Sequence, residues 1–550
     1  MVTGLLIFTI MIFLFAYFTY GRFLSKKILC LDDSHKTPAH LFKDGIDFVP
    51  ARTPILFGHH FSSIAGAGPI IGPIIAGFTW GWLPVFLWIL FGCIFLGAVH
   101  DTSAIVVSIR NKAQSIAEIS KIYLSNRVGM IFKIFIWLAL LYVVAVFINV
   151  AQLTFVSKLP IIKNGEIIQK IPIGGGVATS AIFYILLAII FGYLIYKKNY
   201  PLSITTFLFV ILVYAGIYLG QLFPIKLSSN IWGIILIIYC GVASVLPVWI
   251  LLQPRDYLSS FLLYGVIIGL FLGIIFSFGK VSINQPAFIH FNTNLGPLFP
   301  ILFITVACGA ISGFHSLVGS GTTAKQLDKE TDALRIGYGA MLMEGVMAVI
   351  ALIIVMIISS SELNLFKKNI AGIYGLGVGE LLHFLGIPKI TGMAFGMLAL
   401  SAFVLTTVDT ATRLSRYIFT ELTGIKNRFI ATGISLILPA ILVFVKYQDP
   451  ITHKYLPVWK ALWPVFGATN QLIGALAFLV GTIWLLTTKN RKYWFILGIP
   501  TILMITITIS ALILLLKKWK LSIVGVASLI QIFLAVWIVI EGIISFKKVF

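Results

Sequence analysis

Long runs of apolar residues follow one another along almost the whole chain, and short polar segments separate them. A helix of about 20 apolar residues crosses the hydrocarbon core of a bilayer, so each run predicts one transmembrane helix. We therefore expect an all-α polytopic membrane protein with about fifteen spans. They are expected at 3–21, 54–78, 82–108, 129–157, 178–196, 201–220, 230–252, 257–278, 297–319, 337–359, 390–421, 428–446, 459–487, 493–516 and 520–546.

The composition agrees with this class of protein. Hydrophobic residues make up 59% of the 550 residues, charged residues make up 11%, and the mean hydropathy is +1.04. These values leave no stretch for a large soluble domain. The four cysteines lie far apart, which favours neither a disulfide framework nor a thiolate metal cluster.

The net charge of +22 raises the question of nucleic acid binding, but the placement of the basic residues argues against it. Lys and Arg occupy the short loops between apolar runs, as in cytoplasmic loops of membrane proteins. Counting the loops alternately predicts an external N-terminus, a cytoplasmic loop before residue 54 and a cytoplasmic C-terminus. Membrane lipid, and not nucleic acid, is the expected surrounding partner.

One apolar run contains polar residues, glycines and prolines that do not stabilise a membrane helix. The run at 54–78 carries His59, His60, Ser62 and Ser63, and then Ala65, Gly66, Gly68 and further Gly and Pro residues. Broken helices in a membrane persist only where protein or a water-filled cavity surrounds them, and many secondary transporters build their sites from such breaks. A close helix contact through small residues is the structural alternative.

Ionisable residues inside other spans are further candidates for a functional site, because each is costly in a membrane. The carboxylates Asp101, Glu344 and Asp409 are candidates for ion coupling. An intrahelical pair with Arg413, four residues later, is the structural alternative for Asp409. The histidines His59, His60, His100 and His315 complete the set and lie at a similar depth in the predicted spans.

A metal site is the main alternative use of these side chains. Histidines and carboxylates on several helices have the right chemistry for a metal ion. The chain has no i,i+4 His-Glu pair and no Cys-x-x-Cys spacing to support one, so whether a metal binds stays open. His59 and His60 point about 100° apart on an intact helix.

Three other stretches qualify the picture. Prolines and an Arg-Asp pair in 246–257 make a second broken helix plausible there. Asn470 and Gln471 lie within the span 459–487, where amides bind a substrate or join helices. The run Gly319 to Lys325 lacks the second Gly and the final Ser or Thr of a phosphate loop, so ATP hydrolysis is unsupported and we expect no enzyme activity.

Eight motifs together resemble the carbon starvation protein A (CstA) family of bacterial inner-membrane transporters. They keep the family's order from about residue 44 to 475. The motifs are Asp44–Pro50, Phe57–Phe61, Ala65–Pro69, Leu246–Tyr257, Ser312–Ser316, Met341–Gly345, Leu405–Arg413 and Phe466–Gln471.

This resemblance implies uptake of pyruvate or short peptides during nutrient starvation, driven by a proton or sodium gradient, without a cofactor. It also implies a leucine-transporter-like inverted repeat of the amino acid–polyamine–organocation (APC) superfamily. We expect a first helix and loop in 1–53, a ten-helix core in 54–421 and additional helices in 428–550. The core would divide into repeats at 54–220 and 230–421, each beginning with a broken helix.

The expected mechanism is alternating access around the break at 65–69. Backbone N–H groups of Ala65, Gly66 and Gly68 would meet a substrate carboxylate. Ser62, Ser63, Asn470 and Gln471 would add hydrogen bonds. Asp101, Glu344 or Asp409 would carry the coupling charge, while the four histidines would tune protonation near neutral pH. The choices between pyruvate and peptide and between proton and sodium, and the oligomeric state, stay open.

Overall fold

The structure, a computed structural model, describes the chain except residues 164–165, 367–368, 449–454, 521 and 550. The described residues are mostly helical, with two short antiparallel hairpins that the hydropathy pattern did not predict. The first half contains α1 (Val2–Ala16, extended by π-helical turns to Ile28), α2 (Pro38–Leu41), α3 (Thr53–Ile64), α4 (Gly68–Trp80), α5 (Trp82–Gly92, joined by a π turn to α6), α6 (Ala98–Arg110), α7 (Ile116–Tyr123), α8 (Asn126–Phe155), β1 (Lys158–Lys163), β2 (Glu166–Pro172), α9 (Gly174–Tyr196), α10 (Leu202–Leu222), α11 (Ser229–Val245) and α12 (Leu252–Phe276).

The second half contains α13 (Leu298–Thr305), α14 (Gly313–Gly321), a π turn Leu334–Gly339 that leads into α15 (Ala340–Ile357), α16 (Ser360–Phe366), α17 (Ile370–His383), α18 (Lys389–Thr423), α19 (Arg428–Phe444), β3 (Lys446–Gln448), β4 (Tyr455–Pro457), α20 (Val458–Leu486), α21 (Phe495–Trp519) and α22 (Ile523–Val549). Short 3-10 turns lie at Thr323–Lys325 and Arg491–Tyr493.

The number of full membrane spans is smaller than expected. Within the described residues, 11 helices are long and apolar enough to cross a membrane, or 12 with the bent pair α3 and α4. The expected spans 230–252 and 428–446 contain the shorter helices α11 and α19, of 17 residues each. The expected span 297–319 is interrupted between α13 and α14. An average over an apolar window does not register such an interruption, so the fifteen spans are not confirmed.

The break between α3 and α4 was predicted from its glycines and is present. The two helices are bent by 41° at residues 65–67. Pro69 occupies the first turn of α4, where its missing N–H costs no helical hydrogen bond. The predicted interruption of this span is therefore confirmed.

A second interruption lies directly against the first. Residues 306–312 separate α13 from α14, and Cys308 of this segment touches Gly68 so closely that a side chain at position 68 would overlap it. A Cβ at Gly72 would meet the carbonyl oxygen of Thr305 at 2.5 Å. Glycine at these positions lets α4 approach the Cys308 side chain and the Thr305 backbone closely, so the two broken helices pack tightly.

Gly68→Ala is expected to destabilise the protein, because overpacking of this kind costs about 1–3 kcal/mol. Thermal unfolding in detergent should show a lower midpoint for the variant. Adding Cys308→Gly should restore most of the loss by removing the overlapping side chain. Gly433→Ala on α19 is the matched control, since nothing lies within 4 Å of its added Cβ, and it should leave the midpoint unchanged.

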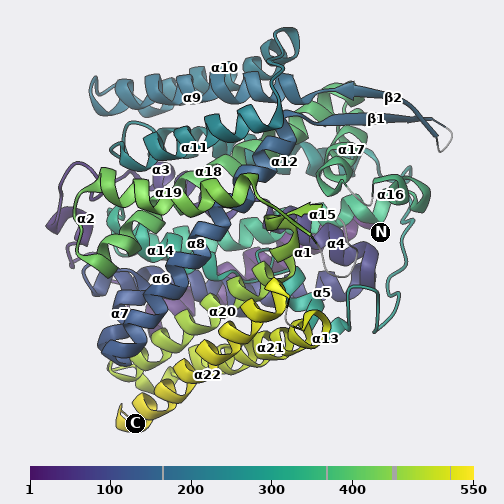
Figure 1. Cartoon of the computed structure of the whole chain (residues 1–550). Coiled ribbons are helices and arrows are strands. Elements are labelled where there is room, and N and C mark those ends of the chain that lie inside the picture. The colour runs from purple at the N-terminus through teal and green to yellow at the C-terminus, as the bar shows by residue number, and fades with distance from the viewer. Residues whose placement is uncertain (164–165, 367–368, 449–454, 521, 550) are drawn as a thin grey trace.

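The buried centre of the bundle surrounds these interruptions. The most apolar windows of α15 and α18 are 89% buried, whereas those of α10 and α22 are 33% buried. Figure 1 shows the α9–α10 pair at one edge of the molecule and α21–α22 at the opposite edge. Helices α8 and α18 contact each other between these edges. The two broken helices therefore lie among the buried helices.

Candidate transport site

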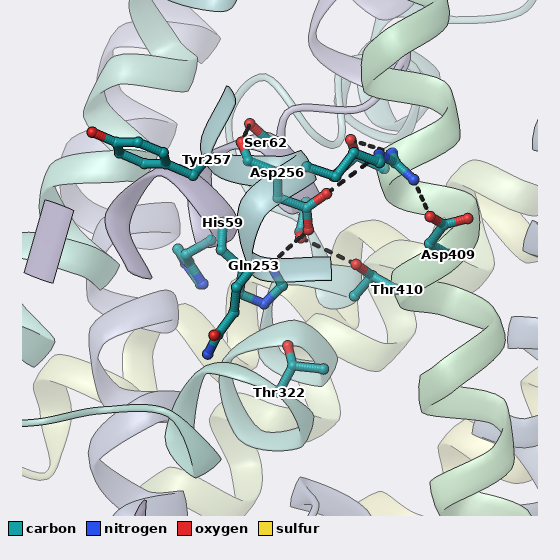
Figure 2. Close-up of polar contacts among 12 residues, drawn as sticks. His59, Ser62, Gln253, Asp256, Tyr257, Thr322, Asp409 and Thr410 are labelled. Carbon is teal, nitrogen blue, oxygen red and sulfur yellow. Dashed lines mark hydrogen bonds and ion pairs between the residues drawn. The ribbon is translucent and has the colours of Figure 1, made fainter. Parts of the chain in front are cut away.

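Asp256, at the start of α12, joins the broken helix α3 to α18. Its Oδ2 lies 2.6 Å from Nδ1 of His59, and its backbone oxygen accepts a hydrogen bond from Ser62 at 2.9 Å (Figure 2). Ser63 lies 3.5 Å from the same Oδ2 and 3.1 Å from the hydroxyl of Thr410 on α18. We call these five residues the Asp256 cluster; all are fully buried.

The neighbouring residue Arg255 forms a buried ion pair with Asp409 on α18. Its guanidinium also donates to the hydroxyl of Tyr239 at 2.7 Å and to that of Thr406 at 2.5 Å. Tyr239 in turn donates to Asp409 at 2.6 Å. A buried ion pair persists only when such hydrogen bonds compensate for lost hydration, and here three helices supply them.

The expected pair of Asp409 with Arg413 is wrong. Arg413 lies 2.9 Å from Asp47, in the loop before α3, and donates to the carbonyls of Ala243 and Leu246 at 2.7 and 2.6 Å. The Arg413 side chain is therefore held by the C-terminal end of α11 and by the loop before α3. Asp409 is neutralised instead by Arg255, which lies far away in the sequence.

A second group of ionisable residues links α15, α14 and α6. Glu344 Oε2 lies 3.3 Å from His315 Nε2, His315 Nδ1 lies 2.8 Å from Asp101, and Asp101 lies 2.9 Å from His100 Nδ1. All four side chains are at most 1% exposed. We call this sequence of contacts the Glu344 chain. It brings together predicted site residues from three helices.

The Glu344 chain has spare hydrogen-bonding capacity. Among the described residues, Glu344 Oε1 and His100 Nε2 have no hydrogen-bond partner, and the 3.3 Å contact between Glu344 Oε2 and His315 Nε2 lacks hydrogen-bond geometry. A buried polar atom without a partner is costly, so such atoms mark places where a proton, an ion or water is exchanged. The Glu344 chain thus has the chemistry of a proton carrier, with nitrogen and oxygen atoms available to bind a proton.

His59 and His60 face different groups, as their spacing on a helix predicts. His59 contacts Asp256, whereas His60 Nδ1 lies 2.8 Å from Thr323 beyond α14. In the part of the chain that the structure describes, no three His, Cys, Asp or Glu residues are grouped as metal ligands. The geometry therefore gives no support to a metal centre built on the two histidines.

Asn470 and Gln471 hold the second interruption in place. Asn470 Oδ1 accepts a hydrogen bond from the backbone of Phe314 at 2.9 Å and one from Ser312 at 3.1 Å. Gln471 donates to the carbonyls of Phe303 and Ile311 at 3.2 and 3.4 Å. Both amides thus lie at the candidate site, and they satisfy backbone groups that the break leaves without helical partners.

The backbone positions predicted for substrate binding lie in the first interruption. Ala65 is the C-cap of α3. Gly66 follows it, and a Cβ at Gly66 would lie 2.7 Å from the hydroxyl oxygen of Thr407. Gly68 begins α4 against Cys308. The first turn of α4 therefore meets both α18 and the second interruption.

The sequence pattern pointed to some important residues without giving them a role. The Arg255–Asp256 pair was noted as a sign of a broken helix, and its place in an apolar segment was the available signal. Tyr239, Thr406 and Thr410 were missed, because single hydroxyl residues in apolar helices carry no distinct pattern.

A cationic cluster closes one end of the bundle around the loop residue Asp47. The carboxylate accepts hydrogen bonds from Arg413, Arg416 and Tyr417 at 2.7 to 3.1 Å. Burial acts to raise the pKa of Asp47, but the charges of Arg416, Arg413 and Lys325 outweigh it and lower the pKa to about 2. The loop before α3 is thus tied to α18 by an ionised carboxylate.

Asp47→Asn is expected to lower the thermal midpoint at neutral pH and to lose that effect in acid. Because the pKa of Asp47 is lowered on folding, its contribution is complete above the ordinary value of about 3.9. It is lost as the pH falls towards about 2. Unfolding curves of both proteins across this range test the prediction, and a difference that persists unchanged at the acid end contradicts it.

The fold resembles that of a solved solute transporter. A manganese transporter of Eremococcus coleocola matches 92% of this chain and 99% of its own, with a TM-score of 0.51 and 14% sequence identity. At this identity the likeness shows the fold alone. The chain is thus a multi-pass helical membrane protein of this fold, with buried polar side chains around its two interruptions.

Sequence comparison identifies the family. The family model of the carbon starvation protein CstA matches residues 1–373 and 362–511, and the chain belongs to this family. The peptide transporter CstA of Helicobacter pylori is 35% identical over 566 residues, covering 90% of this chain and 79% of the relative. The pyruvate/proton symporter BtsT of Escherichia coli is 31% identical over 606 residues, covering 92% and 80%. The predicted family is confirmed, and these relatives support a transporter.

Proposed function

We propose that the protein is a secondary active transporter for pyruvate or short peptides and works by alternating access around its two broken helices. The carrying observation is that α3 contacts two buried ionisable groups, the Asp256 cluster through His59 and the Glu344 chain through its packing on α14 and α15. The first interruption contacts the second through Gly68 and Cys308. Relatives named as peptide transporters and as a pyruvate/proton symporter support both substrates.

The substrate carboxylate is proposed to bind N–H groups at the break, at Ala65, Gly66 and Gly68. In the structure Ala65 and Gly66 donate to the carbonyls of Phe61 and Ile64, so a substrate would replace these two bonds. In the structure Ser62 and Ser63 are engaged with Asp256, so their proposed contact with substrate requires α3 to move. Asn470 and Gln471 line the opposite interruption. Their bonds to Ser312 and Ile311 are the ones that a substrate would replace.

A proton is the coupling ion that we favour. The Glu344 chain consists of groups that exchange protons, and three contacts of 2.8 to 3.3 Å connect its four members. BtsT is named a proton symporter, which supports the same choice. Sodium coupling through Asp409 is less favoured, because Arg255 already neutralises that carboxylate.

We also propose an inverted repeat, with a register shifted from the expected 54–220 and 230–421. The first repeat would comprise α3/α4, α5–α6, α8, α11 and α12, and the second α13/α14, α15, α18, α19 and α20. Matched contacts support this register, since α4 packs on α15 as α14 packs on α6, and α3 packs on α12 as α13 packs on α20. The α9–α10 pair would then be an insertion.

Uptake into proteoliposomes tests this function. Labelled pyruvate and a labelled dipeptide would each be offered under an imposed proton gradient and, separately, a sodium gradient. We expect accumulation of one substrate or both with the proton gradient, in a bacterial inner-membrane protein whose C-terminus is cytoplasmic. Absence of gradient-driven uptake of either compound by folded protein would overturn the proposal.

A further inference from the structure

Two small hollows lie end to end along one face of α14. The first is lined by Ser115, Ser320, Lys325 and Glu421, together with residues of α8 and α18. The second is lined by Phe314, Phe466 and Asn470, together with residues of α8. The same two side chains, Leu140 and Leu317, line both hollows. Leu140 and Leu317 thus form a wall that the two hollows share.

The second hollow begins at the proposed substrate site. Asn470 and Phe314 line it, and these are the residues that meet at the start of α14, where the second interruption ends. Its wall is otherwise apolar and aromatic. A ligand leaving the interruption along α14 would therefore enter this hollow first.

The first hollow lies at the other end of α14 and is polar. Lys325 follows α14 directly, and its Nζ lies 3.6 Å from the centre of the Tyr417 ring. Among the described residues no carboxylate is within ion-pair distance of this ammonium group, while the Glu421 carboxylate accepts a hydrogen bond from Ser115 at 2.5 Å. The Asp47 and Glu421 carboxylates act on this charge from a greater distance, but Lys325, Arg413 and Arg416 together outnumber them, so the region keeps capacity to attract an anion.

We propose that the two hollows are the closed form of one substrate path, which runs from the interruption along α14 to Lys325 and conducts small carboxylate anions. Leu140 on α8 and Leu317 on α14 form its constriction, and both are at most 3% exposed. The proposal rests on the proposed transport function and adds a route and an anionic substrate class. The route lies on the face of α14 that is turned towards α8 and α20, away from the Asp256 cluster.

The constriction is tested by substitution and by labelling. Leu317→Trp should slow pyruvate uptake about tenfold or more, equivalent to about 1.4 kcal/mol, because the larger side chain fills the constriction. Leu138→Trp is the matched control on α8; Leu138 is 47% exposed and should accept the change without loss of uptake. In a background without the native cysteines, Leu317→Cys should react with a small thiol reagent during turnover and be protected by excess pyruvate.

The anion preference is tested at Lys325. Lys325→Met should lower pyruvate uptake severalfold, whereas Lys325→Arg should keep most of it because the charge is retained. The path is overturned if Leu317→Cys stays unreactive during turnover, or if Leu317→Trp and Lys325→Met transport pyruvate at the wild-type rate. Wild-type uptake separates these results from failure of the proposed function, which would abolish uptake in the unmodified protein as well.

Discussion

Glu344→Gln is expected to abolish gradient-driven uptake while the protein remains folded. Glutamine has nearly the same shape as glutamate but takes up no proton, so the Glu344 chain would lose its terminal carrier. The loss should be at least about 100-fold, the lower range for removal of a group that transfers a proton. Exchange of labelled for unlabelled substrate across the membrane, which needs no net proton movement, should persist.

The matched control for this result is Glu380→Gln. Glu380 lies on α17 and pairs with Lys389 in a contact that is 37% and 49% exposed on its two sides. Its neutralisation should leave gradient-driven uptake unchanged, because exposed ion pairs contribute little. Full accumulation by Glu344→Gln would remove Glu344 from the ion path, and Asp101 would then be the next carboxylate to neutralise.

The second large effect is expected at the buried pair of Arg255 and Asp409. Asp409→Ala leaves the buried Arg255 guanidinium with only the more distant Asp256 carboxylate, 3.7 Å from its Nε, and breaking a buried pair costs about 3–5 kcal/mol. The thermal midpoint in detergent and the yield of monodisperse protein should both fall strongly. Tyr239 and Thr406 still accept hydrogen bonds from Arg255 but carry no compensating charge.

The double variant Arg255→Met with Asp409→Leu separates charge from packing. It removes both charges and replaces them by apolar side chains, so most of the lost stability should return. If the double variant is as unstable as Asp409→Ala, the hydrogen bonds of Arg255 and not its charge hold these helices together. Uptake by the double variant would show whether the pair takes part in transport at all.

The class of the protein and the first interruption were predictable from local patterns. Apolar runs give the membrane class, and the glycines and Pro69 give the break in α3/α4 because they weaken a helix wherever they occur. The break between α13 and α14 was not predicted as an interruption, because its segment 306–312 is as apolar as a span. Helix length in α11 and α19 was overestimated for the same reason.

The identity of the ionisable residues was predictable, and their partners were not. His100, Asp101, His315 and Glu344 stood out because charge is costly in a membrane, yet only the packing of α6, α14 and α15 shows that they form one chain. For Asp409, spacing favoured Arg413, but α12 places Arg255 beside it. Sequence spacing describes one helix, whereas a buried charge selects its partner among all helices that surround it.

The adjacency of His59 and His60 has a mechanical consequence. Both belong to one continuous body, the 12-residue helix α3 that ends at the break. A tilt of that body away from α12 would stretch the contact of His59 with Asp256 and, in the same movement, change the distance from His60 to Thr323. Any rigid movement of α3 would therefore change the contact of His59 and the contact of His60 together.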